Sequence, residues 1–237
     1  MPPALTNLYP GVSTGNPTLS DIDPVWPIPN PFDHTWYMDD FEEYVAGDWT
    51  VTETDSGATE ALTTGHGGQL LITNTAADND VTSLQKLTTA FVFAANRKAW
   101  MAFRLKASEA TDFEVMVGLA ATDTSPIASL PSDGAYFYKA DDAATWAFHT
   151  RGGSAALQTA SGLATLTADT FQKLAMYYDG GTKIQVYIDG VKVSTLEAAF
   201  ASLFPTAALR VTIACQAGAA AAKTLTVDYA YVMFGRA

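Results

Sequence analysis

The chain has 237 residues and a mass of 25.2 kDa, enough for one large domain or two small ones. Charged residues make up 16% of it and the formal net charge is −12, which argues against a nucleic-acid partner because phosphate neutralisation needs clustered Lys and Arg. A single cysteine excludes a disulfide framework and any metal site built from several cysteines.

Proline is concentrated at the N-terminus, where residues 1–31 hold eight of the eleven prolines. Proline lacks a backbone N–H and clashes with a preceding helical turn, so this stretch is predicted to be extended, near polyproline II. Its apolar side chains favour docking on a partner, and packing on its own domain is the alternative. We predict an extended arm, residues 1–37, with the partner-binding residues Val25, Trp26, Pro27, Ile28, Pro29, Pro31, Phe32 and Trp36.

Charge is also uneven along the chain. Residues 1–85 carry thirteen acidic and no basic side chains, and the remainder holds twelve acidic and thirteen basic ones. This asymmetry favours an interaction surface, and a solvated acidic face that keeps the protein soluble is the alternative. The N-terminus lacks the basic and apolar regions of a signal peptide, and no run approaches the ~18 apolar residues of a membrane span. We therefore expect neither a signal peptide nor a membrane partner.

Alternation of apolar and polar residues dominates residues 38–237 and is typical of half-buried strands. Two Asp-Gly turns, at Asp179 and Asp189, supply the positive φ angles of tight hairpins and predict a three-strand meander over residues 174–193. Helical periodicity is limited to residues 196–204, before Pro205. The pattern predicts one all-β domain of two packed sheets. The other alternating segments are residues 101–105, 113–119, 136–138, 146–148, 209–215 and 225–231.

The segment from Phe171 to Val193 contains an aromatic residue, an apolar strand, Tyr-Asp-Gly, a second apolar strand and Asp-Gly, in that order. This order resembles the late hairpin of concanavalin A-like and laminin G-like jelly rolls. Residues 39–42 and 47–50 resemble the first strands of that fold, and residues 225–234 resemble its last strand, which returns beside the first. The resemblance covers residues 38–237 and implies a two-sheet antiparallel jelly-roll sandwich.

An acidic, proline-rich arm before a lectin-like jelly roll is also similar to structural proteins of tailed phages, such as capsid decoration (cement) proteins. That resemblance implies a homotrimer on the capsid surface of a virion, where the arm attaches to the major capsid protein or another virion protein and stabilises the shell. The alternative is a fibre or tail protein, or a carbohydrate-binding module in which exposed aromatic residues stack on sugars. The candidates for stacking are Tyr136, Tyr138, Trp146 and Tyr187.

Enzymes of this fold are mostly glycan hydrolases, which need two carboxylates beside the scissile bond. Their Glu-x-Asp-x-x-Glu pattern is approached only by Glu53, Asp55 and Glu60, the last of which lies two positions too late. Asp112 and Glu114 share one strand face but lack a third carboxylate, so we interpret them as solvated strand residues. We predict no catalytic residue and no enzymatic activity.

The remaining polar motifs give no strong metal signal. His34, His66 and His149 lack the spacing of a metal site. Residues 78–80 offer oxygen ligands for calcium, although a polar turn between strands is favoured. Cys215 lies on the apolar face of its predicted strand and is interpreted as a small buried hydrophobe. We expect neither a metal nor a cofactor.

Overall fold

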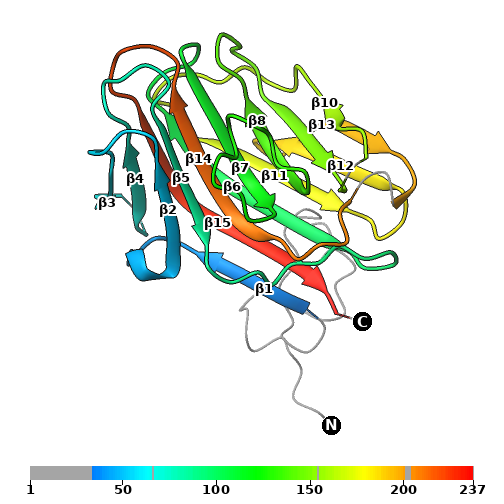
Figure 1. Ribbon diagram of the computed structural model, residues 1–237. Helices are drawn as coiled ribbons and strands as arrows, with labels where there is room; N and C mark the ends of the chain where they lie inside the picture. The colour runs from blue at the N-terminus through cyan, green and yellow to red at the C-terminus, as the bar shows by residue number, and fades with distance from the viewer. Residues whose placement is uncertain (1–33, 66, 154, 201–203, 237) are drawn as a thin grey trace, which may run out of the picture.

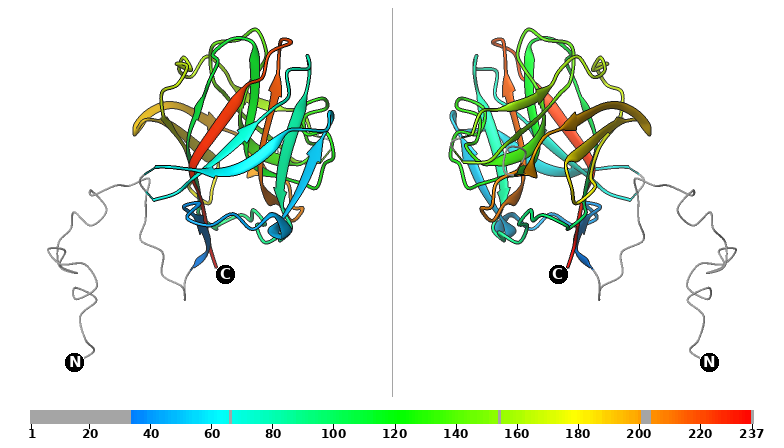
Figure 2. Two further views of the ribbon diagram at one scale, coloured as in Figure 1. Left: turned by 90° about the vertical axis from the view of Figure 1, so that its left-hand side faces the viewer. Right: turned by 90° about the vertical axis from the view of Figure 1, so that its right-hand side faces the viewer.

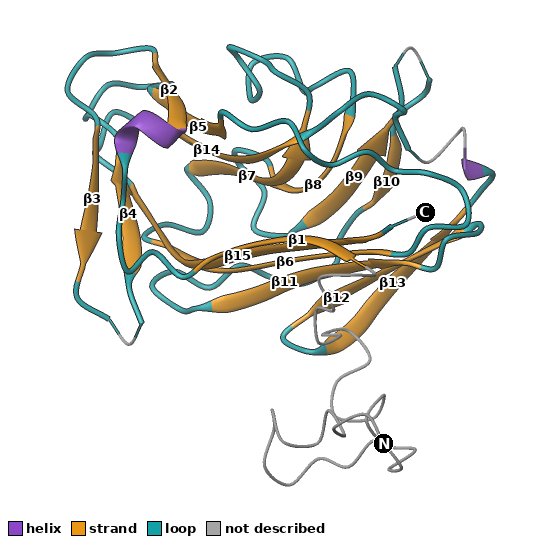
Figure 3. Ribbon diagram, turned by 90° about the horizontal axis from the view of Figure 1, so that it is seen from below, coloured by secondary structure: helices purple, strands orange, loops and turns teal. Residues whose placement is uncertain are grey.

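A computed structural model describes residues 34–65, 67–153, 155–200 and 204–236. Within these ranges fifteen strands form two antiparallel sheets that lie as two layers (Figure 3), which confirms the predicted all-β sandwich. The strands are β1 (His34–Asp39), β2 (Trp49–Glu53), β3 (Thr59–Thr63), β4 (Gln69–Thr73), β5 (Val81–Lys86), β6 (Ala99–Ala107), β7 (Phe113–Ala120), β8 (Gly134–Lys139), β9 (Ala147–Arg151), β10 (Gln158–Ala160), β11 (Gln172–Tyr178), β12 (Lys183–Ile188), β13 (Val191–Glu197), β14 (Arg210–Ala217) and β15 (Thr224–Gly235).

The strands are divided between two sheets, A and B. Sheet A has the order β13-β12-β11-β6-β15-β4-β3, with β1 paired to β15, and sheet B has the order β10-β9-β8-β7-β14-β5-β2. Strand β15 is 12 residues long; β6 lies along one of its edges, and β4 and β1 share the other. The last strand thus returns beside the first, as predicted, with His34 opposite Gly235 (Figures 1 and 2).

The core lies between the sheets and is built by strict alternation. Phe103 of sheet A and Val115 and Phe137 of sheet B are fully buried there, and the next residue along each strand points to an outer face. The predicted meander is confirmed as β11-β12-β13. Cys215 is also a buried core residue, as predicted, and burial raises the pKa of its thiol, so the sulfur stays protonated.

The predicted helix over residues 196–204 is wrong at its start. Leu196 and Glu197 belong to β13, where they pair with Ile184 and Lys183, and this ladder overrides the weak helical periodicity. The amide of Phe204 donates a hydrogen bond to the carbonyl of Phe200 at 3.0 Å. Residues 201–203 lie outside the ranges that the structure describes.

The arm residues from Val25 to Phe32 also lie outside the described ranges, so docking through them stays a prediction. Trp36 lies on β1, which begins at His34, inside the segment predicted to be the arm. The division of the chain at residues 37 and 38 likewise stays a prediction.

The acidic run at residues 78–80 forms a polar turn built around one buried carboxylate. Asp80 is 0% exposed and accepts hydrogen bonds from Thr54 Oγ1 at 3.1 Å, Asp55 N at 3.2 Å and Thr75 N at 2.6 Å. Its oxygens therefore join the β2–β3 loop to the β4–β5 loop, and their lone pairs are used by protein donors.

Candidate functional site

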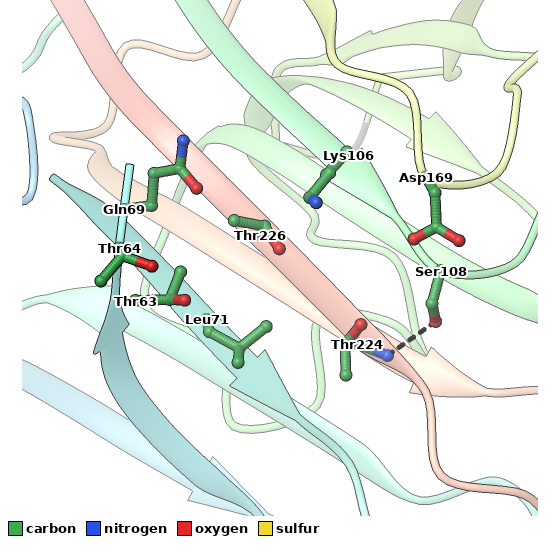
Figure 4. A pocket seen from close by; sticks show the side chains of 9 residues that line it. All are labelled: Thr63, Thr64, Gln69, Leu71, Lys106, Ser108, Asp169, Thr224 and Thr226. Carbon is green, nitrogen blue, oxygen red and sulfur yellow. Dashed lines mark hydrogen bonds between the residues drawn. The ribbon is translucent and has the colours of Figure 1, made fainter. Parts of the chain in front are cut away.

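A pocket of about 270 Å³ lies on the outer face of sheet A, where β15 runs between β4 and β6. Figure 4 shows one wall from β3 and β4, the opposite wall from the end of β6 and the β10–β11 connection, and β15 between them. Eight of the nine lining residues are polar, and Leu71 is the exception. The polar ones are Thr63, Thr64, Gln69, Lys106, Ser108, Asp169, Thr224 and Thr226.

Strand alternation aims these side chains outward. Lys106 and Thr226 are cross-strand partners in the β6–β15 ladder, and they point to the outer face because Leu105 and Leu225 occupy the core. At the end of the pocket Ser108 Oγ accepts from the Thr224 amide at 2.9 Å, the bond drawn in Figure 4.

One wall carries a positive and a negative charge. Lys106 Nζ lies 5.3 Å from the centroid of the Phe171 ring, and this cation–π contact holds the ammonium group at the rim. Asp169 has a φ of 56°, in the left-handed region that few non-glycine residues occupy, and its amide donates to Ala107 O at 2.8 Å. The end of β6 thus fixes the backbone that places the carboxylate in the pocket (Figure 4).

On the opposite wall, the side chain of Gln69 is oriented by the partly buried ion pair between Arg104 and Asp228. Asp228 sits at a register shift of β15, is 8% exposed, and accepts from Arg104 Nη1 at 2.7 Å and from Gln69 Nε2 at 3.2 Å. The hydrogen bond that Gln69 donates to Asp228 fixes the amide of Gln69 and leaves its carbonyl oxygen on the pocket side (Figure 4).

Hydroxyl groups, an amide, an ammonium and a carboxylate around one small hollow supply both donors and acceptors. The volume is just below the ~300–1,000 Å³ of typical small-molecule sites. Such a lining suits a small ligand rich in hydroxyl groups better than an apolar or a highly charged one.

The outer face of sheet B carries a second polar cluster. Tyr138 donates its hydroxyl hydrogen bond to the Glu114 carboxylate, and the ring of His149 lies 5.1 Å from that of Tyr138. Glu114 is only 9% exposed, so its interpretation as a solvated residue is wrong, and burial raises the pKa of its carboxyl. Burial lowers the pKa of His149 to about 4.

The β7–β8 connection, residues 121–133, folds over the neighbouring part of this face. Ile127 is 5% exposed and packs in one cluster with Met116 and Tyr136. Gln85 of β5 binds the same connection twice, donating to Ala121 O at 3.1 Å and accepting from the Asp123 amide at 2.9 Å. Glu114 and His149 are 9% and 7% exposed, so the polar cluster offers little surface to a polymer.

The aromatic residues predicted for sugar stacking do not form one surface. Trp146 and Tyr136 are fully buried, and the indole N–H of Trp146 donates a hydrogen bond to Gln172 Oε1 at 2.9 Å. Tyr138 and Tyr187 are half-buried on opposite sheets. The pocket residues escaped sequence reasoning because they come from five separate segments and include no conspicuous motif.

The candidate metal ligands are likewise dispersed. His34 lies on sheet A and His149 on sheet B, whereas His66 is outside the described ranges. In the part of the chain that the structure describes, no group of three or more His, Cys, Asp or Glu side chains is arranged to hold a metal ion. The same part contains no helix of the length and apolarity that a bilayer crossing requires.

Two face-to-face antiparallel sheets with this strand order define a jelly-roll sandwich. Residues 103–226, just over half of the 237, match the family model of the concanavalin A-like lectin/glucanases superfamily. The chain belongs to this superfamily, which confirms the resemblance drawn from its hairpin. No curated protein matches the sequence.

Solved structures share the fold at low identity. An endo-1,3-β-glucanase from Streptomyces sioyaensis has a TM-score of 0.64 and 14% identity, covering 88% of this chain and 99% of that one. The Emp47p carbohydrate recognition domain has a TM-score of 0.61 and 14% identity, covering 89% and 100%. An endo-β-1,4-glucuronan lyase from the fungus Trichoderma reesei has a TM-score of 0.56 and 12% identity, covering 85% and 95%.

These neighbours contradict the prediction that the protein is not an enzyme. That prediction rested on the missing Glu-x-Asp-x-x-Glu strand, yet the same sandwich is the body of a glucanase and a glucuronan lyase. A contiguous motif is a poor test, because a site can also be assembled from residues of separate segments, as the lining of this pocket is. Asp169 lines the pocket from a loop, and Asp228 of β15 accepts a hydrogen bond from the lining residue Gln69.

Proposed function

We propose that the protein binds carbohydrate in the pocket on the outer face of sheet A. The observation that carries the proposal is the lining itself, in which Lys106 and Asp169 face Gln69 and Thr63 across Thr226 (Figure 4). A sugar ring presents alternating donors and acceptors, and this pocket offers partners for both. Lectins and glycan-cleaving enzymes among the structures of the same fold support the proposal.

The two charged residues are expected to supply most of the affinity, because hydrogen bonds to charged groups are the stronger ones. We predict that Asp169→Asn and Lys106→Met each weaken glycan binding about 10-fold or more, since a charge-assisted bond is worth about 1.5–3 kcal/mol. A glycan array on the full chain identifies the sugar, and titration calorimetry with that sugar measures the loss.

Lys192→Met is the matched control, since Lys192 is an exposed lysine on β13, away from the pocket. The Lys192→Met variant is expected to bind the glycan as tightly as the unaltered chain does. Release of reducing ends from the bound glycan is measured in the same samples, which shows whether binding leads to cleavage. Absence of any bound glycan, or equal affinity in the Asp169 and Lys106 variants, would rule the pocket out.

A second candidate function is attachment to the shell of a virion through the N-terminal arm. Trp36 and Met38 favour it: they are 48% and 44% exposed on β1, directly after the proline-rich segment. Large exposed apolar side chains that lie together mark interaction surfaces. In this proposal the arm contacts the major capsid protein or another virion protein, and the sandwich stays on the capsid surface as a decoration protein.

Deletion of residues 1–33 is expected to abolish attachment and to leave the circular dichroism of a β-protein, because every described strand from β1 to β15 is retained. Co-sedimentation with candidate shells measures attachment. The control is Leu87→Ser, which changes an exposed apolar residue outside the arm. Full occupancy of the shell by the truncated chain would show that the arm does not make the attachment.

A further inference from the structure

Three basic residues occupy neighbouring positions on the outer face of sheet A, beginning in the pocket. Lys106 lines the pocket, Arg104 lies two residues before it on β6, and Lys173 of β11 is the cross-strand partner of Arg104. Leu105 and Leu174 are core residues, so strand alternation turns the three basic side chains outward. We call Lys106, Arg104 and Lys173 the basic strip.

The ring of Phe171 positions two members of the basic strip. Arg104 Cζ lies 4.2 Å and Lys106 Nζ lies 5.3 Å from the centroid of this ring. An aromatic ring attracts a cation through its quadrupole but carries no net charge, so the contact orients the two groups without neutralising them. The positive charge of Lys106 therefore stays at the rim of the pocket.

The acidic neighbours of the basic strip cancel only part of its charge. Asp228 accepts from Arg104 Nη1 at 2.7 Å and neutralises that residue. Among the residues that the structure describes, Lys106 and Lys173 have no acidic partner in an ion pair. Lys173 is exposed, whereas Lys106 is partly buried and has lost part of its hydration. A buried charge is costly unless it is paired, so this side of the pocket favours an anionic group on the ligand.

Asp169 gives the pocket a direction. Its side chain extends from the β10–β11 connection, whereas that of Lys106 extends from β6, and the two form no ion pair with each other (Figure 4). A carboxylate only accepts hydrogen bonds and an ammonium only donates them. A ligand that carries an acid group at one position and hydroxyl groups at another satisfies both residues. Its acid group accepts from Lys106, and its hydroxyl groups donate to Asp169.

We propose that the pocket binds a sugar that carries a carboxylate, a hexuronic acid, with this carboxylate on Lys106. Further acidic units of a polyuronate chain then lie over the basic strip toward Lys173. This inference rests on the carbohydrate proposal and adds the chemical class of the sugar. An amino sugar fits less well, because its ammonium group would reach Asp169 only beside the positive charge of Lys106.

The net charge of −12 does not oppose an anionic ligand at this place. Exposed charges more than about 8 Å apart are largely screened at physiological ionic strength, so the nearest charges decide. Residues 1–85, which hold thirteen acidic and no basic side chains, supply the strands β1 to β5. The neighbours of β6 are β11 and β15, so no strand from the acidic part of the chain adjoins β6.

The test compares charged and neutral forms of the same sugar on the full chain. The probes are short oligomers of glucuronic, galacturonic and mannuronic acid, each beside its methyl ester, which lacks the charge but keeps the ring hydroxyl groups. Titration calorimetry is expected to show that at least one acid binds about 10-fold more tightly than its own ester, because charge-assisted hydrogen bonds are the stronger ones. Added NaCl at about 0.5 M is expected to remove most of this preference and to leave ester binding unchanged.

Lys106→Gln keeps a hydrogen-bond donor and removes the charge. This variant is expected to bind acid and ester almost equally, whereas a loss of pocket shape would weaken both forms alike. Lys173→Gln is expected to weaken acid binding about 3-fold, the effect of an exposed ion pair, without changing ester binding. Lys192→Gln is the matched control, because Lys192 is an exposed lysine on the edge strand β13, and it is expected to keep the full preference for the acid.

Equal affinity for acids and esters in the unaltered chain would overturn this inference. Ester binding that Asp169→Asn weakens would then still support the carbohydrate proposal. A preference for the acid that persists in Lys106→Gln would also overturn the inference, as would tighter binding of a chitosan oligomer than of every acid. If no acid binds, the inference fails, and binding of neutral sugars on the glycan array decides the carbohydrate proposal by itself.

Discussion

Replacing Asp80 with alanine is expected to lower the free energy of unfolding by about 3 kcal/mol or more. The carboxylate is fully buried and accepts from Thr54, Asp55 and Thr75, and a hydrogen bond to a charged group contributes about 1.5–3 kcal/mol. Alanine leaves these donors without their acceptor inside the protein. For a chain of this size, that loss corresponds to a fall in melting temperature of about 6–12 °C.

Asp78→Ala is the matched control for this prediction, since Asp78 has the same side chain two positions earlier but is exposed. It is expected to melt within about 1–2 °C of the unaltered chain, because exposed substitutions usually stay within ±0.5 kcal/mol. Thermal denaturation followed by circular dichroism measures both variants. Equal melting temperatures for the two would show that the Asp80 carboxylate contributes no more than a surface charge.

Replacing Gly118 with alanine is expected to destabilise the protein by about 1–3 kcal/mol, the usual cost of overpacking. A Cβ at this position would lie 2.5 Å from Tyr136 Cα and 2.6 Å from Ala135 O, which are backbone atoms of β8. Strand β8 is held by ladders to both β7 and β9, so it cannot move aside without breaking hydrogen bonds.

Gly47→Ala is the control for the Gly118 variant, because nothing lies within 4 Å of the added Cβ there. Urea denaturation compares the two: the midpoint of Gly118→Ala is expected to fall, and that of Gly47→Ala to stay near the original. If Gly118→Ala were as stable as the unaltered chain, the sheet would have to yield at this point, contrary to the close approach of β7 and β8.

The fold was predictable where local pattern and tertiary burial agree. Phe103 and Leu105 alternate with charged residues because one face of β6 meets the core and the other meets solvent, and the Asp-Gly pairs mark hairpins by their backbone requirement alone. Strands β3, β4 and β5 were not predicted. Val81 to Gln85 is buried on both faces, so its polar residues give no alternation to detect.

The candidate site was far less predictable. Tyr136 was a candidate surface aromatic in the sequence, but Ile127 of the β7–β8 connection packs with it, and no local signal shows where a loop will fold. Glu114 was interpreted as solvated, yet it is 9% exposed beside Tyr138. The pocket depends on Asp169 meeting Lys106, residues whose proximity is set by sheet order. The absence of a contiguous acidic motif also led to the prediction of no enzymatic activity, which the structural neighbours contradict.

The pairing of β1 with β15 has a consequence for how the chain reaches its native state. His34 and Gly235 are partners although they lie 201 positions apart in the sequence, and β6, β4 and β1 all pair with the same strand, β15. Closing so long a loop costs conformational entropy before any stabilising contact forms, so such topologies fold slowly. Until residues 224–235 are available, β1 has no strand to pair with, so assembly of sheet A must wait for β15.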